Sequence, residues 1–156
     1  MYNSEDKAFQ LWDLLWLLSH LIMKLREREL KNYNLSAIRA SVLYIVTVLE
    51  RKAIPAEIAR QLLREPHSIS HLISSMEKEG LVNKVNDLDR KNLVRVVLTK
   101  SGHQAYELTK NRHSIHKVMS VLSKQEQEQM MCMLQRIWDK AIEELRSGNF
   151  HRETTG

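Results

Sequence analysis

Apolar residues recur at helical spacing along most of this chain and predict four long helices. The first covers residues 6–31 and is apolar on nearly every side in its middle, so it needs more than one packing partner. The second covers residues 36–49. Near the C-terminus, one helix is expected to run unbroken from about residue 99 to residue 121, and another from 123 to 146. This pattern predicts a mainly α fold.

Two of these helices carry start signals. Ser36 can cap the second helix, because a side-chain oxygen at that position accepts a hydrogen bond from an otherwise unpaired backbone amide. Ser123 and Glu126 have the spacing of a capping box, in which the serine and the glutamate each bind the other's backbone amide. These signals predict where the two helices begin.

Between the long helices, the pattern predicts a helix-turn-helix. Residues 55–63 form the first helix, with proline in its first turn, where the missing amide does no harm. Arg64-Glu65-Pro66 forms the turn, and its proline prevents the first helix from continuing. The second helix is predicted by Ile69, Leu72, Ile73 and Met76, which recur at i, i+3, i+4 and i+7 and share one buried stripe.

A small hairpin is expected after this second helix. Residues 81–86 and 93–98 predict two strands, the second with a clear period of two, and the polar stretch between them is rich in turn formers. Ala53-Ile54 fits a short third strand beside the hairpin. A helix-turn-helix followed by a basic hairpin is a winged helix.

The outward side of the second helix carries short hydrogen-bonding groups and weak cations. Such side chains suit the major groove of DNA, where base edges present donors and acceptors at close range. A solvated surface helix more often carries pairs of glutamate and lysine. The predicted DNA-binding residues on this helix are His67, Ser68, Ser70, His71, Ser74, Ser75 and Lys78.

Charge and size agree with a small DNA-binding protein. The chain has 156 residues, 43% of them hydrophobic, which is enough for one domain with a core. The formal net charge is +5, and residues 60–100 hold eight basic side chains against five acidic ones. That local excess favours a lobe that binds a polyanion over an ordinary basic surface.

Four segments then resemble the MarR (multiple antibiotic resistance regulator) family. They are Ser68 to Ile73 followed by Met76-Glu77-Lys78-Glu79-Gly80-Leu81-Val82, the acidic-basic tip Asp89-Arg90-Lys91, and Leu98-Thr99-Lys100-Ser101-Gly102 at the close of the wing. The motif-bearing part covers about residues 54–102. His71 and Ser75 stand where many relatives carry arginines, and the wing is one residue longer than the commonest spacing.

The resemblance implies a winged helix-turn-helix lobe at residues 36–98 and dimerisation helices at 6–35 and 99–146, with a disordered tail at 147–156. The apolar surface of the terminal helices also predicts a homodimer, because one small lobe cannot cover it. Two-fold symmetry would place two recognition helices about one duplex turn apart, on a pseudo-palindromic operator in double-stranded DNA.

In this family, an arginine of the wing enters the minor groove, and an acidic neighbour orients it. The resemblance assigns these roles to Arg90 and Asp89, with Lys91 as the alternative to Arg90. The family also commonly holds small aromatic or phenolic ligands between the dimerisation helices and the lobe. Trp16, His20 and Tyr44 provide apolar surface and hydrogen-bonding groups for such a ligand.

Other site chemistries find little support. His113 and His116 have a metal-ligand spacing, with His20 and His103 as conceivable partners, but solvent-facing histidines are the better interpretation, so no metal or other cofactor is predicted. The single cysteine, Cys132, fits a reducing cytoplasm and an inert, partly buried thiol. No catalytic set is found, so an enzyme is not expected.

The apolar run in the first helix is too short and too interrupted to span a bilayer, and it has no features of a signal peptide. The sequence therefore predicts a cytoplasmic, dimeric transcriptional regulator, most often a repressor in this family, with a small-molecule effector. The alternatives are a winged-helix scaffold that docks a protein partner and a metal- or redox-responsive regulator.

Overall fold

The computed structural model describes residues 5–86 and 93–147. The chain divides into two compact units, residues 1–115 and 116–156, which are described separately. Asp89, Arg90 and Lys91 of the expected wing tip lie outside the described residues, as do residues 148–156 of the expected tail. Ser147, the first residue of that expected tail, is instead the last residue of a helix.

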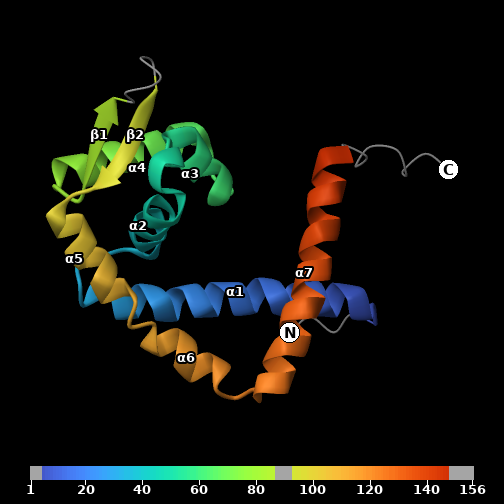
Figure 1. Ribbon diagram of the computed structural model, residues 1–156. Coiled ribbons are helices and arrows are strands. Elements are labelled where there is room, and N and C mark those ends of the chain that lie inside the picture. Colours follow the sequence, from blue (N-terminus) through green and yellow to red (C-terminus); the bar gives the residue numbers. More distant parts are fainter. Residues whose placement is uncertain (1–4, 87–92, 148–156) are drawn as a thin grey trace. The chain divides into compact units, whose positions relative to one another are not determined.

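The predicted fold class is confirmed: the described chain is mostly helical and has one two-stranded antiparallel hairpin (Figure 1). In chain order the elements are α1 Lys7–Lys31, α2 Ala37–Leu49, the 3₁₀ helix η1 Glu50–Lys52, α3 Pro55–Gln61, α4 Pro66–Lys78, β1 Val82–Asn86, β2 Val94–Leu98, α5 Lys100–Thr109, α6 His113–Met119 and α7 Lys124–Ser147.

The core of the first unit forms around α2 and α4. Ile69, Ile73 and Met76 are buried, and Leu72 is half-buried against them, so the predicted apolar stripe of α4 faces inward. On α2 the buried side chains include Val42 and Leu43. β1 packs against α4, and β2 packs against α2 and α3. This core fixes the orientation of α4 and turns its polar side to solvent.

The close of the wing has a clear structural role. Thr99 caps α5 by accepting a hydrogen bond from the amide of Gly102 (3.0 Å), and its hydroxyl donates to the carbonyl oxygen of Gly80 (2.5 Å). A Cβ atom on Gly102 would lie 1.9 Å from the carbonyl oxygen of Leu81, so only glycine fits there. The Leu-Thr-x-x-Gly sequence therefore joins the wing to α5 and to the end of α4.

The predicted third strand at Ala53-Ile54 is wrong. The described sheet has only two strands, paired from Val82 with Leu98 to Asn86 with Val94. The amide of Val96 in β2 donates to the carbonyl oxygen of Ala53 (2.7 Å), whereas the amides of Ala53 and Ile54 donate to Glu50 and Lys52 of η1. Only two residues separate η1 from Pro55, which has no amide and begins α3, so the segment is too short for a ladder.

The predicted unbroken helix from residue 99 to 121 is also wrong, because the chain breaks into α5 and α6 at residues 110–112. Arg112 has a φ of 46° there, in the left-handed region. Two side chains of α1 stabilise the break. Arg26 donates to the carbonyl oxygen of Thr109 (2.6 Å) at the end of α5, and the Glu29 carboxylate accepts from the amides of His113 (2.7 Å) and Ser114 (3.3 Å) at the start of α6. Helical periodicity along α5 and α6 could not reveal partners from α1.

The pKa of the Glu29 carboxyl group is well below that of an ordinary glutamate. Burial alone would raise its pKa, but hydrogen bonds from Ser114 and Arg26, the charge of Arg26 and the amide of His113 together lower it from 4.5 to about 2. Because the folded pKa lies below the unfolded one, Glu29 stabilises the fold fully above pH 4.5. This contribution is lost as the pH falls from 4.5 toward 2.

We therefore expect Glu29→Gln to lower the free energy of unfolding at pH 7 by up to about 3 kcal/mol. The difference from the parent should shrink as the pH falls from 4.5 toward 2. Urea unfolding of both proteins across this range measures it. Glu107→Gln, which breaks an exposed ion pair with Lys110, is the control and should change little. A gap between Glu29→Gln and the parent that is independent of pH would contradict this role.

The second unit contains α7, whose predicted start is confirmed. The amide of Ser123 donates to the carboxylate of Glu126 (2.7 Å), and the amide of Glu126 donates back to the Ser123 hydroxyl (3.3 Å). None of the described side chains of α7 is buried within the chain. Cys132 is accordingly exposed, not partly buried as the sequence suggested.

Candidate nucleic-acid interface

The polar side of α4 lies on the surface, as its pattern predicts. His67, Ser68, Ser70, His71 and Lys78 are exposed, whereas Ser74 and Ser75 are half-buried. The helix begins at Pro66, with Glu65 as its N-terminal flanking residue, so His67 and Ser68 lie in its first turn. The N-terminal half of α4 therefore presents short polar groups in the position from which recognition helices contact base edges.

His67 and His71 face the same side of α4, one turn apart. Their ring centroids are 4.9 Å apart and the rings meet edge to face. Both residues are exposed, so the paired imidazoles are accessible from solvent. Each ring can donate or accept hydrogen bonds and so can discriminate base edges in the major groove.

Ser75 is engaged by an arginine that sequence reasoning did not single out. Arg39, in the first turn of α2, donates to Glu79 (2.5 Å) and to the Ser75 hydroxyl (3.3 Å), and the Ser75 hydroxyl donates to Glu79 (2.9 Å). Arg39 is 40 residues from Glu79 in sequence, so no local pattern could reveal the pair. The network places a cation beside the C-terminal half of α4.

Ser74 is engaged in a similar way by Lys84 of β1. The Lys84 ammonium donates to the Ser74 hydroxyl (2.7 Å) and lies 3.1 Å from the carboxylate of Glu77. The Lys84 amide also donates to Glu77 (2.9 Å), and these hydrogen bonds lower the pKa of Glu77. Because Ser74 and Ser75 already have partners, the exposed groups available to bases lie mainly at His67 to His71, and the cations nearby suit phosphates.

The predicted effector residues are only partly brought together. Trp16 and His20 lie one turn apart on α1, with ring centroids 4.6 Å apart, and the His20 Nδ1 donates to the Trp16 carbonyl oxygen (2.8 Å). The Trp12 ring also stacks on Trp16, with ring centroids 6.5 Å apart. In the described part of the chain, Tyr44 of α2 shares no hydrogen bond or ring contact with Trp16 or His20, although it is exposed.

Other predicted features can be placed as well. His113 and His116 are exposed, and within the described residues no three histidine, cysteine, aspartate or glutamate side chains gather as a metal site. Searched over the same residues, none of the helices combines the length and the apolar character that crossing a membrane requires.

Comparison with known proteins agrees with this geometry. The winged helix DNA-binding domain family matches residues 35–102. YybA of Bacillus subtilis, an uncharacterized HTH-type transcriptional regulator, is 24% identical over 112 residues, or 70% of this chain and 73% of YybA. The structure of the organohalide-sensing regulator RdhR with bound 2,4-dichlorophenol is 25% identical, with a TM-score of 0.77, and the match covers 100% of this chain and 94% of RdhR.

A second solved structure is a mutant of MarR from E. coli complexed with operator DNA. It is 16% identical, with a TM-score of 0.77, and the match covers 87% of this chain and 99% of that one. At this identity the likeness shows a shared fold. The fold includes the terminal helices as well as the winged helix, because the match extends well beyond residues 35–102.

Proposed function

We propose that this chain, a DNA-binding winged-helix regulator of the MarR family, acts in the cytoplasm as a homodimeric repressor that a small aromatic or phenolic ligand releases from DNA. The matched winged helix domain and the likeness to RdhR and MarR confirm the family resemblance. The observation that carries the proposal is the exposed polar half of α4 from His67 to His71, held outward by a buried apolar stripe.

Support for DNA as the partner comes from the surroundings of this helix. Arg39 and Lys84 lie beside the C-terminal half of α4. Each forms an ion pair there, Arg39 with Glu79 and Lys84 with Glu77. In many protein–DNA complexes, cations at the edge of the recognition helix hold the phosphates while the helix reads the bases. In this chain the two cations lie beside the C-terminal half of α4 and suit phosphates, whereas the exposed residues His67 to His71 lie in its N-terminal half and suit bases.

Support for the homodimer comes from the two terminal helices, each taken by itself. On α1 the side chains of Leu11, Trp12 and Leu14 are about half exposed, and on α7 Met133, Ile137 and Trp138 are similarly exposed. Apolar surface of this extent on a single chain is typical of an association interface. A second copy of the chain is the simplest partner that would bury this apolar surface. The symmetric dimer would suit a pseudo-palindromic operator.

Support for an aromatic ligand comes from Trp16 and His20. Because His20 donates through Nδ1 to the Trp16 carbonyl oxygen, its Nε2 atom remains to accept a hydrogen bond from a phenol when the ring is neutral. Trp16 is 50% exposed and offers an aromatic surface for a planar ligand. RdhR, which this chain resembles, binds 2,4-dichlorophenol.

The test of this function is binding selection from random duplexes. A regulator of this kind should enrich a pseudo-palindromic consensus with half-sites about one duplex turn apart. Binding should also weaken steeply as salt rises, because phosphate contacts release counterions. If no sequence is enriched and retention does not depend on salt, the winged helix docks a protein partner instead. A phenol titration on the selected duplex then tests ligand release.

We expect Arg90→Ala to weaken DNA binding without a change in the melting temperature. Losing one cationic contact in each subunit should make the slope of log affinity against log salt shallower by about 2. Affinity measured over a salt series checks this, with Lys91→Ala as the matched variant. If only Lys91→Ala changes the slope, Lys91 takes the minor-groove role. If neither does, the predicted wing contact is wrong.

A further inference from the structure

Glu79, at the C-terminal end of α4, holds the guanidinium of Arg39 beside the proposed DNA-binding surface. Arg39 donates through Nη2 to the Glu79 carboxylate (2.5 Å) and to the Ser75 hydroxyl (3.3 Å). The Ser75 hydroxyl donates to the same carboxylate (2.9 Å). The ion pair is open to solvent, since 27% of the Arg39 side chain and 40% of the Glu79 side chain are exposed. A phosphate group can therefore reach the guanidinium.

Arg39 also retains hydrogen-bond donors that the ion pair does not use. Both of its side-chain contacts with α4 are made by Nη2. Within the residues that the structure describes, its Nη1 and Nε atoms donate to no other group. A guanidinium binds phosphate through two parallel N–H groups, and these two atoms can supply them. A phosphate bound in this way would be a second anion at a guanidinium that Glu79 already neutralises.

Glu77 forms a comparable ion pair with Lys84, but it is held differently. Its carboxylate lies 3.1 Å from the Lys84 ammonium and also accepts a hydrogen bond from the Lys84 backbone amide (2.9 Å). That backbone contact links α4 to β1, because Lys84 belongs to β1. Among the described residues, the Glu79 carboxylate contacts only the side chains of Arg39 and Ser75. Glu79 can therefore release its cation without breaking a backbone hydrogen bond.

The stability of α4 does not explain a carboxylate at position 79. Glu79 ends the helix, and the C-terminal end of a helix carries a partial negative charge that disfavours an anion. An ion pair with this much exposure adds little to stability. The carboxylate is instead placed where it neutralises a cation of the proposed DNA-binding surface.

We propose that the Glu79 carboxylate competes with DNA phosphate for Arg39. In the free protein the guanidinium binds Glu79, and in the complex a phosphate of the duplex takes the place of the carboxylate. This inference rests on the proposed function, because it requires the duplex to lie against α4. Since the ion pair must break whenever that phosphate binds, Glu79 lowers the affinity for all duplexes alike. Base contacts from His67 to His71 then supply the affinity that distinguishes a preferred sequence.

Glu79→Gln is the direct test, measured as the affinity for the selected duplex and for a random-sequence duplex. Glutamine removes the charge but keeps a hydrogen-bond acceptor, so the melting temperature should stay close to the parent's. Both affinities should rise by about threefold to tenfold, because the dimer loses two competing ion pairs. An unchanged affinity would overturn the proposal. A lower affinity would also overturn it, because Glu79 would then position Arg39 for phosphate.

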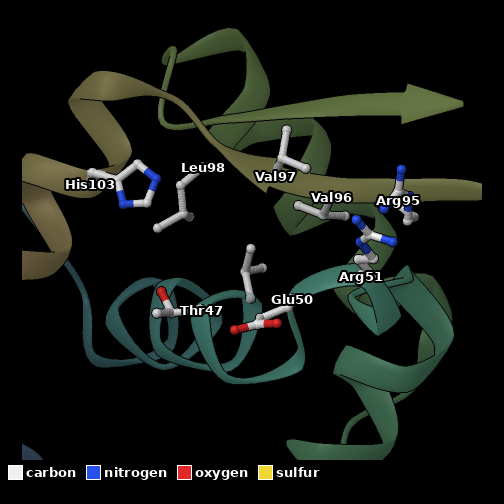
Figure 2. A pocket seen from close by; sticks show the side chains of 9 residues that line it. Thr47, Glu50, Arg51, Arg95, Val96, Val97, Leu98 and His103 are labelled. Carbon is white, nitrogen blue, oxygen red and sulfur yellow. The ribbon is translucent and has the colours of Figure 1, made fainter. Parts of the chain in front are cut away.

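Glu50→Gln is the matched control, because it removes the same charge from the same unit. Figure 2 shows Glu50 at a hollow between α2, η1 and β2, which no residue of α4 lines. Glu50 is exposed and forms no ion pair within the described residues. Its gain in DNA affinity should be smaller and should vanish as salt rises, because charges more than about 8 Å apart are largely screened at 0.15 M. Equal gains in Glu79→Gln and Glu50→Gln would contradict the proposal.

A double-mutant cycle with Arg39→Gln separates competition for Arg39 from direct repulsion between Glu79 and the duplex. If Glu79 acts by occupying Arg39, adding Glu79→Gln to the Arg39→Gln protein should raise the affinity no more than adding Glu50→Gln does. A full gain in the absence of Arg39 would show that Glu79 repels the phosphates directly, and it would overturn the proposal.

The random-sequence duplex separates this proposal from the proposed function. A parent that selects no sequence, with a Glu79→Gln protein that binds random duplexes more tightly than Glu50→Gln, would refute the proposed function and support the competition. Selection of a palindrome with equal affinities in Glu79→Gln and Glu50→Gln would refute the competition alone. Failure of all these proteins to bind any duplex would refute both.

Discussion

Ile137→Asp is expected to give a folded monomer that no longer binds operator DNA. In the single chain the Ile137 side chain is 46% exposed, so an aspartate there costs the monomer little. In a dimer that buries α7, each copy would place an unpaired carboxylate in an apolar interface, at several kcal/mol. The dimer should therefore weaken by about a hundredfold or more.

Sedimentation velocity and a duplex-binding titration together measure this effect. Leu14→Asp on α1 should act in the same way, because Leu14 is 47% exposed in the single chain. Gln129→Asp introduces the same charge at an exposed polar position of α7 and should keep both the dimer and DNA binding. Intact dimers in both Ile137→Asp and Leu14→Asp would show that the terminal helices do not form the interface.

His71→Ala is expected to change which base pairs the protein prefers. His71 is exposed on the first half of α4, and a good contact to a base edge is worth about 1–3 kcal/mol of discrimination. The loss should therefore fall on one or two positions of the selected consensus and leave the others unchanged. Ser70→Ala should behave similarly at a neighbouring position.

Repeating the selection with each variant checks this expectation. Arg39→Gln is the informative comparison, because Arg39 lies beside the C-terminal half of α4 and is expected to contact phosphate. It should weaken binding to all duplexes alike and make the salt dependence shallower by about 2 for the dimer. If His71→Ala gives that uniform pattern instead, α4 positions the protein without reading bases at His71.

The elements themselves could be predicted from local pattern. The apolar stripe of α4, the Ser36 and Ser123 caps and the hairpin all depend on residues within a few positions of one another. Helical spacing, capping hydrogen bonds and strand alternation are short-range effects, so the sequence alone determines them. The resemblance to MarR regulators could also be recognised from the sequence, because the motifs that carry it all lie within residues 54–102.

Contacts between distant segments were decided only by the tertiary structure. Arg26 and Glu29 of α1 end α5 and begin α6, about 80 residues later in the chain, so helical periodicity predicted one helix where there are two. Arg39 and Lys84 engage Ser75 and Ser74 through the packing of α2 and β1 beside α4. Periodicity shows which face of a helix is buried, but it does not show which side chains from elsewhere meet that helix.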